Sequence, residues 1–125
     1  MALEPVIHIV DDDAAVRDAL SVLFEAEGLA SKVYPSARAF HEAGTLAEAG
    51  CVVTDVHMAG MSGLQLLRRL RSSGGDLPVV IITGRADRAL AAEALAAGAA
   101  AFVEKPFHAD EIIAAVRAAL AARGG

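Results

Sequence analysis

Three consecutive aspartates, Asp11, Asp12 and Asp13, follow directly on an apolar run of the sequence. Carboxylates about 5 Å apart repel one another by about 3 kcal/mol per pair at an effective dielectric constant near 20. Such a cluster stays ionised only beside a cation or with shifted pKa values. Mg²⁺ suits a half-open site of oxygen ligands, because it keeps several waters and takes only one or two carboxylates from the protein. The run therefore predicts a site for Mg²⁺, or for Mn²⁺ in its place. No histidine or cysteine has the spacing that zinc would need.

Three further polar residues follow other apolar runs: Asp55, Thr83 and Lys105. If those runs are parallel strands, their carboxyl ends lie at one edge of a sheet, and the polar groups converge with the aspartates. A carboxylate beside a metal ion can attack an activated phosphoryl group and form an aspartyl phosphate. The charge that develops on the phosphoryl oxygens must then be met by the metal, a lysine and a hydroxyl group. Asp55 is the natural acceptor, with Lys105 and Thr83 as its helpers.

The spacing of apolar residues along the sequence predicts the strands and helices that must position these residues. Short β-branched runs predict strands, and the longer segments between them have apolar residues at helical spacing. The predicted strands are Val6–Val10, Ala30–Tyr34, Cys51–Asp55, Val79–Thr83 and Ala100–Glu104. Five strands alternating with five helices predict an α/β fold with a doubly wound parallel sheet.

Residues that begin and end helices agree with this prediction. Short polar side chains that favour N-caps precede the helical segments, and glycines follow two of them. The predicted N-caps are Asp13, Ser36, Ser62 and Asp87, and the predicted helix ends lie at Gly28 and Gly98. For Asp13 this role is favoured over metal binding.

Composition excludes several classes of protein. The net charge is −5, from 16 acidic and 11 basic residues, which argues against non-specific binding to DNA or to an anionic membrane. Cys51 is the only cysteine, so no disulfide forms within the chain, and we expect a buried thiol in a reducing compartment.

No segment is long and apolar enough for a transmembrane helix. We predict one cytoplasmic domain over residues 1–125, with its core from about residue 6 to about residue 120.

Four motifs carry a resemblance to a known family: "IVDDD", "VVTDVHMAGMSG", "VVIITG" and "FVEKPF". Together they resemble the receiver domains of two-component response regulators, and the sequence is most similar to receivers of the FixJ type. The resemblance runs from about Val6 to Leu120. Each motif alone has little specificity, but four in this order and spacing are specific. The resemblance implies a flavodoxin-like (βα)5 fold whose five-stranded parallel sheet has the order 2-1-3-4-5, a fold for which receivers are a standard example.

The resemblance also implies roles around the metal ion. Asp55 matches the phosphoacceptor, which ligates the metal as well. Asp12 matches a direct metal ligand, and Asp11 a further one, directly or through water. His57 stands where the backbone carbonyl completes the coordination.

Further roles implied by the resemblance concern the phosphoryl group and the response to it. Thr83 and Lys105 match the hydroxyl and the lysine that contact the phosphoryl group, and Lys105-Pro106 matches a cis peptide bond. Phe102 matches the switch aromatic, although it lacks the hydroxyl of the tyrosine that many relatives have. With Thr83 it forms the predicted switch pair.

The implied function is a switch driven by phosphorylation and not a conventional enzyme, since the domain would catalyse only its own phosphorylation and dephosphorylation. A histidine kinase is the expected phosphodonor. Phosphorylation would remodel the face made by the fourth helix, the fifth strand and the fifth helix. That change would favour a homodimer or an output domain, with transcription regulation as the expected output. We expect no direct contact of this domain with nucleic acid or membrane.

Other functions fit the same residues less well. A haloacid-dehalogenase-type phosphohydrolase would use Asp11 and Asp13 with Mg²⁺, but its second pair of acids and an insertion for a cap are missing. A flavodoxin-like flavin site fails because three aspartates would repel the phosphate of FMN. A receiver that has lost phosphorylation and serves only dimerisation is disfavoured by the complete set of polar residues.

Overall fold

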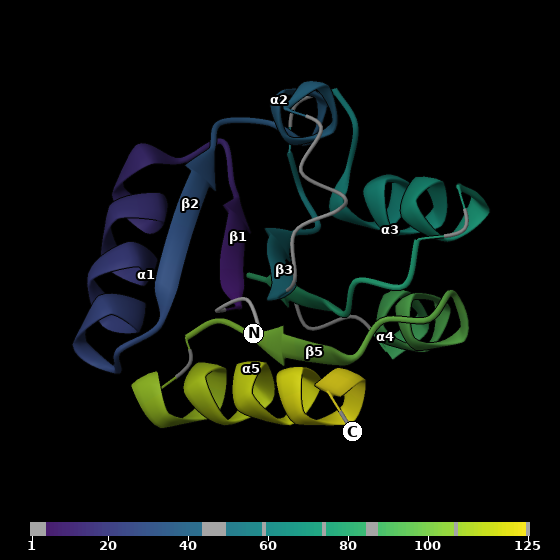
Figure 1. Ribbon diagram of the computed structural model, residues 1–125. Coiled ribbons are helices and arrows are strands. Elements are labelled where there is room, and N and C mark those ends of the chain that lie inside the picture. The colour runs from purple at the N-terminus through teal and green to yellow at the C-terminus, as the bar shows by residue number, and fades with distance from the viewer. Residues whose placement is uncertain are drawn as a thin grey trace.

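Five strands and five helices alternate along the part of the chain that the computed structural model describes, which is residues 5–43, 50–58, 60–73, 75–84, 88–106 and 108–124 (Figure 1). The strands are β1 (Val6–Val10), β2 (Ala30–Tyr34), β3 (Gly50–Asp55), β4 (Val79–Thr83) and β5 (Ala101–Glu104). The helices are α1 (Ala14–Ala26), α2 (Ala37–Glu42), α3 (Gly63–Ser72), α4 (Arg88–Ala96) and α5 (Ala109–Gly124). All strand pairs are parallel, and the sheet order is β2-β1-β3-β4-β5. The predicted fold is confirmed, and only the first residues of β3 and β5 differ from the prediction, by one position each.

Helices cover both faces of the sheet (Figure 1). Successive side chains of a strand point to opposite faces, so each strand contributes to two separate apolar clusters. In β1, Ile7 and Ile9 pack with Leu20 and Phe24 of α1 and with residues of α5. Val10 of the same strand packs in the other cluster, with residues of α2, α3 and α4. The result is a three-layer molecule in which α1 and α5 lie on one face and α2, α3 and α4 on the other.

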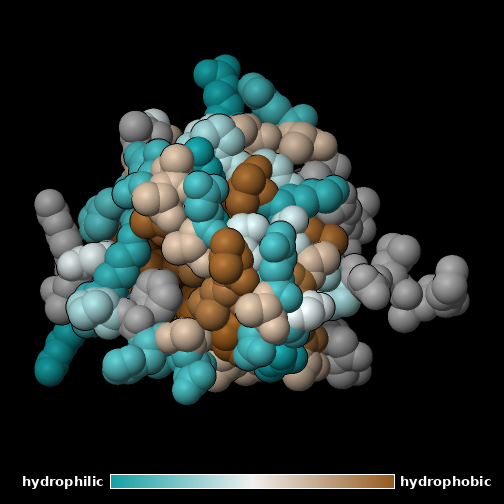
Figure 2. Space-filling view, turned by 90° about the vertical axis from the view of Figure 1, so that its left-hand side faces the viewer, coloured by the Kyte–Doolittle hydropathy of each residue, from teal (hydrophilic) through white to brown (hydrophobic). Residues whose placement is uncertain are grey.

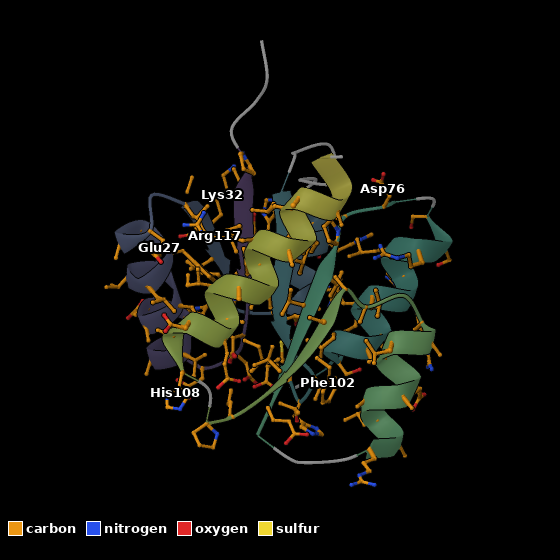
Figure 3. The ribbon with its side chains drawn as sticks, turned by 90° about the horizontal axis from the view of Figure 1, so that it is seen from below. Glu27, Lys32, Asp76, Phe102, His108 and Arg117 are labelled. Atoms are coloured by element: carbon orange, nitrogen blue, oxygen red, sulfur yellow. The ribbon has the colours of Figure 1, made fainter. Side chains whose placement is uncertain are left out.

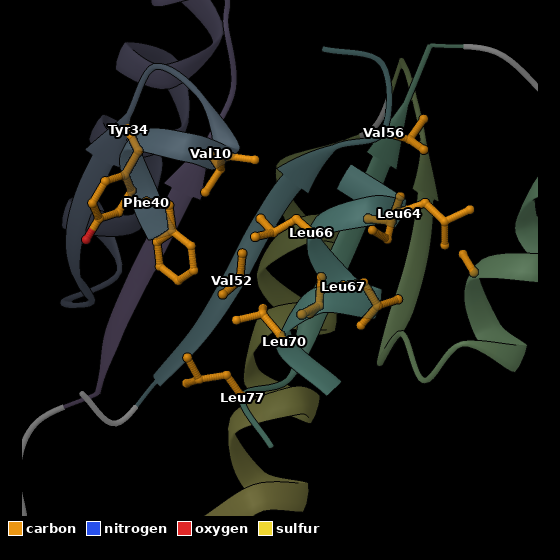
Figure 4. Packing of buried hydrophobic residues seen from close by; sticks show 14 residues of the cluster. Val10, Tyr34, Phe40, Val52, Val56, Leu64, Leu66, Leu67, Leu70 and Leu77 are labelled. Atoms are coloured by element: carbon orange, nitrogen blue, oxygen red, sulfur yellow. The ribbon is translucent and has the colours of Figure 1, made fainter. Parts of the chain in front are cut away.

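The cluster on the α2 and α3 side is dense with large side chains (Figure 4). Tyr34 and Phe40 meet edge to face, with their ring centroids 5.1 Å apart. Leu66 and Leu67 of α3 are fully buried beside β3 and β4. Every residue of β3 and β4 is buried, as expected for central strands of a parallel sheet that is covered on both faces.

Three of the predicted N-caps are present. The Asp13 carboxylate accepts from the amides of Ala15 and Val16, at 2.9 and 3.4 Å. Ser36 accepts from the amide of Ala39. Ser62 and Gln65 form a reciprocal capping box. Each cap contributes about 1 kcal/mol to helix stability. The fourth predicted cap, Asp87, lies outside the described residues.

Cys51 is fully buried in β3, as predicted from the sequence. Burial raises the pKa of its thiol to about 12, so the group stays protonated at neutral pH. Of the helices in the described part of the chain, none combines the length and the apolar character needed to cross a membrane.

The side of the molecule formed by α1 and the edge strand β2 exposes apolar side chains among polar ones (Figure 2). Val22 of α1 is 66% exposed and Val33 of β2 is 46% exposed. Lys32 beside Val33 is exposed as well. A lysine in an edge strand discourages pairing with a strand of another chain, and β2 therefore ends the sheet on this side.

Gly50, the first residue of β3, allows this strand to approach β1 closely. Its φ is +142°, and a Cβ placed there would lie 1.9 Å from the carbonyl oxygen of Val6, its partner in the sheet. We predict that Gly50→Ala lowers the free energy of unfolding by at least about 3 kcal/mol, because the clash is with backbone that cannot rotate away. Urea denaturation monitored by circular dichroism measures this change.

Gly84→Ala is the matched control, since a Cβ at Gly84 meets nothing within 4 Å and its φ is not in the positive range. We expect that variant to stay within about 1 kcal/mol of the unsubstituted protein. Equal destabilisation by the two substitutions would contradict the role assigned to Gly50.

Candidate functional site

The loop after β1 holds the first two aspartates at the carboxyl edge of the sheet. Asp11 is 3% exposed, and its amide donates to the carbonyl of Tyr34 at 3.2 Å. The Asp11 Oδ1 accepts from the amide of Asp13 at 2.9 Å. Asp12 is exposed. The cap formed by Asp13 directs the chain into α1, and this leaves Asp11 and Asp12 at the site.

Asp55 ends β3, one residue beyond the sheet pair of Val10 with Thr54. This register brings Asp55 beside Asp11, which follows Val10 in the chain. Both carboxylate oxygens of Asp55 are bonded: Oδ1 accepts from the amide of His57, and Oδ2 contacts Lys105 Nζ, each at 2.8 Å. Asp55 is 9% exposed, so most of the residue is shielded from solvent.

The ends of β4 and β5 supply the remaining predicted residues. Thr83 is fully buried at the end of β4, and its carbonyl accepts from the amide of Lys105 at 2.7 Å. The Lys105-Pro106 peptide bond is cis, as the resemblance implied. Phe102 pairs with Ile81 on β4 and is half-buried against the cluster that includes Leu90 of α4 (Figure 3). Phe102 and α4 thus pack on the same apolar cluster.

Burial has opposite effects on the pKa values of Asp11 and Lys105, and neighbouring groups change both values further. Burial raises the pKa of Asp11, and the charges of Asp55 and Asp12 raise it further, against the lowering effects of the Asp13 amide and of Lys105. Burial alone would lower the pKa of Lys105, but the hydrogen bond and charge of Asp55, with Asp11 and Asp13, outweigh it and raise the value. Lys105 is therefore a cation at neutral pH, and the pocket keeps an excess of negative charge.

The ligands that this pocket offers to a metal are all oxygens: the carboxylates of Asp11, Asp12 and Asp55 and the backbone carbonyl of His57. Over the described ranges of the chain, no three Asp, Glu, His or Cys side chains already form a metal cage. Mg²⁺ does not require one, because it binds through one or two carboxylates and keeps several waters. The excess negative charge at Asp11 and the oxygen-only donor set fit Mg²⁺ or Mn²⁺, and they do not fit zinc.

Sequence reasoning missed the close contact that holds the loop after β3. A Cβ at Gly63, the first residue of α3, would lie 2.5 Å from the carbonyl oxygen of Asp55. The amide of Gly63 donates to the carbonyl of Val56 at 3.2 Å. Any larger residue would push α3 away from Asp55. The signal available in the sequence was a glycine at the start of a helix, where alanine has the better helix propensity.

This combination of a doubly wound parallel sheet and an acidic pocket with a lysine defines the class of receiver domains. The family model described as response regulator receiver domain matches residues 7–117. The transcriptional regulatory protein FixJ of Azorhizobium caulinodans is 51% identical over 114 residues, which is 91% of this chain and 54% of that protein. The C4-dicarboxylate transport transcriptional regulatory protein DctR of Rhodobacter capsulatus is 42% identical over 121 residues, which is 95% of this chain and 61% of that protein. The chain belongs to the response regulator receiver family of two-component systems.

Solved structures agree with this assignment. The crystal structure of FixJ-N superimposes with a TM-score of 0.89 at 39% identity and covers 96% of each chain. Full-length FixJ from B. japonicum gives a TM-score of 0.87 at 38% identity and covers 96% of this chain but 59% of that one. The present chain therefore spans little more than half the length of the FixJ proteins that it matches.

The haloacid-dehalogenase alternative is not supported. The receiver family accounts for residues 7–117, which is nearly the whole chain. In addition, the Asp13 carboxylate, which that reaction needs as its acid and base, is bonded to amides of α1 as a helix cap.

The raised pKa of Asp11 leads to a prediction for the metal-free protein. A carboxyl whose folded pKa is raised stabilises the fold only while it is protonated, below its ordinary pKa of 3.8, and that contribution is lost as pH rises through the folded pKa. Asp11→Asn should therefore stabilise the metal-free protein at pH 7, because the amide keeps an acceptor for Asp13 and removes the charge. We expect a gain on the order of 1 kcal/mol, or about 4 °C in melting temperature.

Thermal melts in EDTA at pH 7 and near pH 3.5 check this prediction, since the gain should shrink at the acidic pH. Asp18→Asn, on the exposed surface of α1, is the control and should change stability by less than about 0.5 kcal/mol. A less stable Asp11→Asn protein at pH 7 would show that the carboxylate is not a source of repulsion.

Proposed function

We propose that Asp55 is the phosphoacceptor of this receiver, with a divalent cation bound by Asp12, Asp55, the carbonyl of His57 and, directly or through water, Asp11. The observation that carries the proposal is the 2.8 Å contact between Asp55 Oδ2 and Lys105 Nζ. It joins the ends of two strands that are separated by β4 in the sheet and holds the carboxylate beside Asp11 in an acidic pocket. The Lys105 ammonium holds this carboxylate in place, and a carboxylate can act as a nucleophile toward an activated phosphoryl group.

The transfer is a displacement at phosphorus. An oxygen of Asp55 forms a bond to the phosphorus atom, and the bond from phosphorus to the donor breaks, so that its electron pair leaves with the donor. The hydrogen bond from the His57 amide to Oδ1 keeps the plane of the carboxylate fixed during this exchange. When bound, Mg²⁺ offsets the negative charge of the carboxylates and of the phosphoryl oxygens.

Lys105 and Thr83 recognise the product. In the unphosphorylated protein the Lys105 ammonium donates to the Asp55 carboxylate at 2.8 Å. Once that carboxylate has become an acyl phosphate, its own charge is lost, and the ammonium turns to the phosphoryl oxygens. The Thr83 hydroxyl donates to another of these oxygens, and this draws the end of β4 toward the site.

The expected phosphodonor is a histidine kinase, and the surface proposed to contact it lies beside Lys105, next to α1. A shallow apolar groove of about 330 Å³ lies between α1 and the residues after β5. Lys105 and Pro106 form one wall of this groove, and Val16, Leu20 and Leu23 form the other. A protein that presents a phosphohistidine to Asp55 buries this groove as it approaches.

Phosphorylation is proposed to act on the face made by α4, β5 and α5. Movement of Thr83 frees space beside Phe102, which lies two residues before Glu104, the partner of Thr83 in the sheet. An inward turn of Phe102 then changes the packing of Leu90 and the surface of α4. The altered face favours a homodimer or an output domain.

The output is proposed to be transcription regulation. This chain spans little more than half the length of FixJ and DctR, which are named as transcriptional regulatory proteins. Contact with DNA is assigned to the remaining part of such proteins and not to this domain. The cytoplasmic location and the absence of catalysis beyond phosphorylation and dephosphorylation of Asp55 stay predictions.

Incubation with acetyl phosphate and Mg²⁺, followed by intact mass spectrometry, tests the assignment of Asp55. We expect one phosphoryl adduct that hydroxylamine removes, because an acyl phosphate reacts with this nucleophile. The adduct should be absent in Asp55→Asn and in EDTA. Its amount should be unchanged within about twofold in Asp18→Asn, since surface substitutions of this kind have small effects.

Two results would contradict the proposal. An adduct that persists in Asp55→Asn would place the acceptor elsewhere, and Asp11 would then be the first residue to substitute. The absence of any adduct in the unsubstituted protein at saturating acetyl phosphate and Mg²⁺ would mean that the pocket does not accept a phosphoryl group.

A further inference from the structure

Arg17 is bonded to the backbone of the aspartate loop. It is the fourth residue of α1, and its Nη1 donates to the carbonyl oxygen of Asp11 at 2.7 Å. The side chain is partly buried. A hydrogen bond from a guanidinium to a carbonyl is charge-assisted and stronger than one between neutral groups.

The position of this arginine is unfavourable for helix stability alone. The positive end of the helix dipole lies at the start of α1, where a cation is disfavoured. Asp13 and Asp18 lie close in sequence, yet in the described part of the chain the Arg17 guanidinium forms an ion pair with neither. The guanidinium instead donates a hydrogen bond to one backbone carbonyl of the acidic loop.

That carbonyl belongs to the peptide group that joins Asp11 to Asp12. The Asp11 residue is already held at two other points, by its amide on Tyr34 and by its carboxylate on the Asp13 amide. Because a peptide group is planar, a bond that fixes its carbonyl also fixes the direction in which the next residue continues. With Arg17 in place, the Asp11–Asp12 peptide has one orientation, and the Asp12 Cα follows it.

We propose that Arg17 is a positioning residue of the metal site: its bond to the Asp11 carbonyl holds the Asp12 carboxylate where the divalent cation binds. This inference rests on the proposed function, because it assigns Asp12 to the cation. Arg17 acts through the backbone and touches neither the cation nor the phosphoryl group. Groups that orient a metal ligand in this way commonly change metal affinity by about 10- to 100-fold when they are removed.

Charge and geometry predict opposite results for the loss of Arg17. A positive side chain near an acidic pocket repels a divalent cation, so its removal would tighten binding if charge alone mattered. If Arg17 positions Asp12, its removal weakens binding although the protein becomes more negative. The sign of the change therefore separates the two explanations.

The experiment measures binding of Mn²⁺ to the purified chain by electron paramagnetic resonance of the free ion. For Arg17→Met, a residue of good helix propensity, we expect the dissociation constant to rise about tenfold. For Arg17→Lys, which keeps the charge and one donor to the same carbonyl, we expect a smaller rise. Melting temperatures in EDTA confirm that each variant is folded, and Arg17→Lys carries the test if Arg17→Met unfolds.

Arg117→Met is the matched control. Arg117 of α5 also donates to a backbone carbonyl, that of Glu27, at 3.4 Å. Figure 3 shows both residues, and Glu27 follows the end of α1 that is opposite to Asp11. The substitution removes the same charge and the same kind of bond away from the pocket. We expect its Mn²⁺ dissociation constant to stay within about twofold of that of the unsubstituted chain.

A dissociation constant that is unchanged or lower in Arg17→Met would overturn the inference, and so would an equal rise in Arg117→Met. In the metal-free protein, the amide NMR signals of Asp12 and Asp13 should move more in Arg17→Met than signals from β5, and unmoved signals also overturn it. Absence of Mn²⁺ binding by the unsubstituted chain would overturn both this inference and the proposed function. Normal binding there, with no effect at Arg17, overturns this inference alone.

Discussion

The contact between Asp55 and Lys105 is the interaction on which the site depends. It joins the carboxyl ends of β3 and β5 across the intervening strand at 2.8 Å. The pKa of Asp11 remains raised beside Lys105, first by burial and then by the charges of Asp55 and Asp12. In the metal-free pocket the carboxylates repel one another, and the packing of the sheet holds them in place. A bound cation would relieve this repulsion, so the same charge that costs stability would favour the binding of a metal.

The sheet can hold such a pocket because its strands are buried on both faces. All residues of β3 and β4 are buried, and their side chains interlock with helices above and below. Two glycines permit the close contacts that set the position of β3. Gly50 lets the start of β3 approach β1, and Gly63 lets α3 begin against the carbonyl of Asp55. The position of one carboxylate is thus determined by backbone contacts at both ends of the strand.

The site is also coupled to a distant surface through ordinary packing. The backbone of Lys105 is bonded to Thr83, and Phe102 of β5 packs on the same apolar cluster as Leu90 of α4. A change in the bonding of Lys105 or Thr83 alters the strand ends on which this packing depends. Cores of this density rearrange between discrete states and do not deform continuously, which is the physical basis of a switch.

The sequence by itself determined the local features of this protein. Strand positions followed from the period of apolar residues, and the caps at Asp13, Ser36 and Ser62 followed from side-chain chemistry, since both depend on neighbours within a few residues. The sheet order came from the resemblance to receivers. Only the tertiary structure decided that Arg17 holds the carbonyl of Asp11, that Gly63 touches Asp55, and that the pKa of Asp11 is raised. These features depend on distances and burial created by the packed sheet, and no local pattern encodes them.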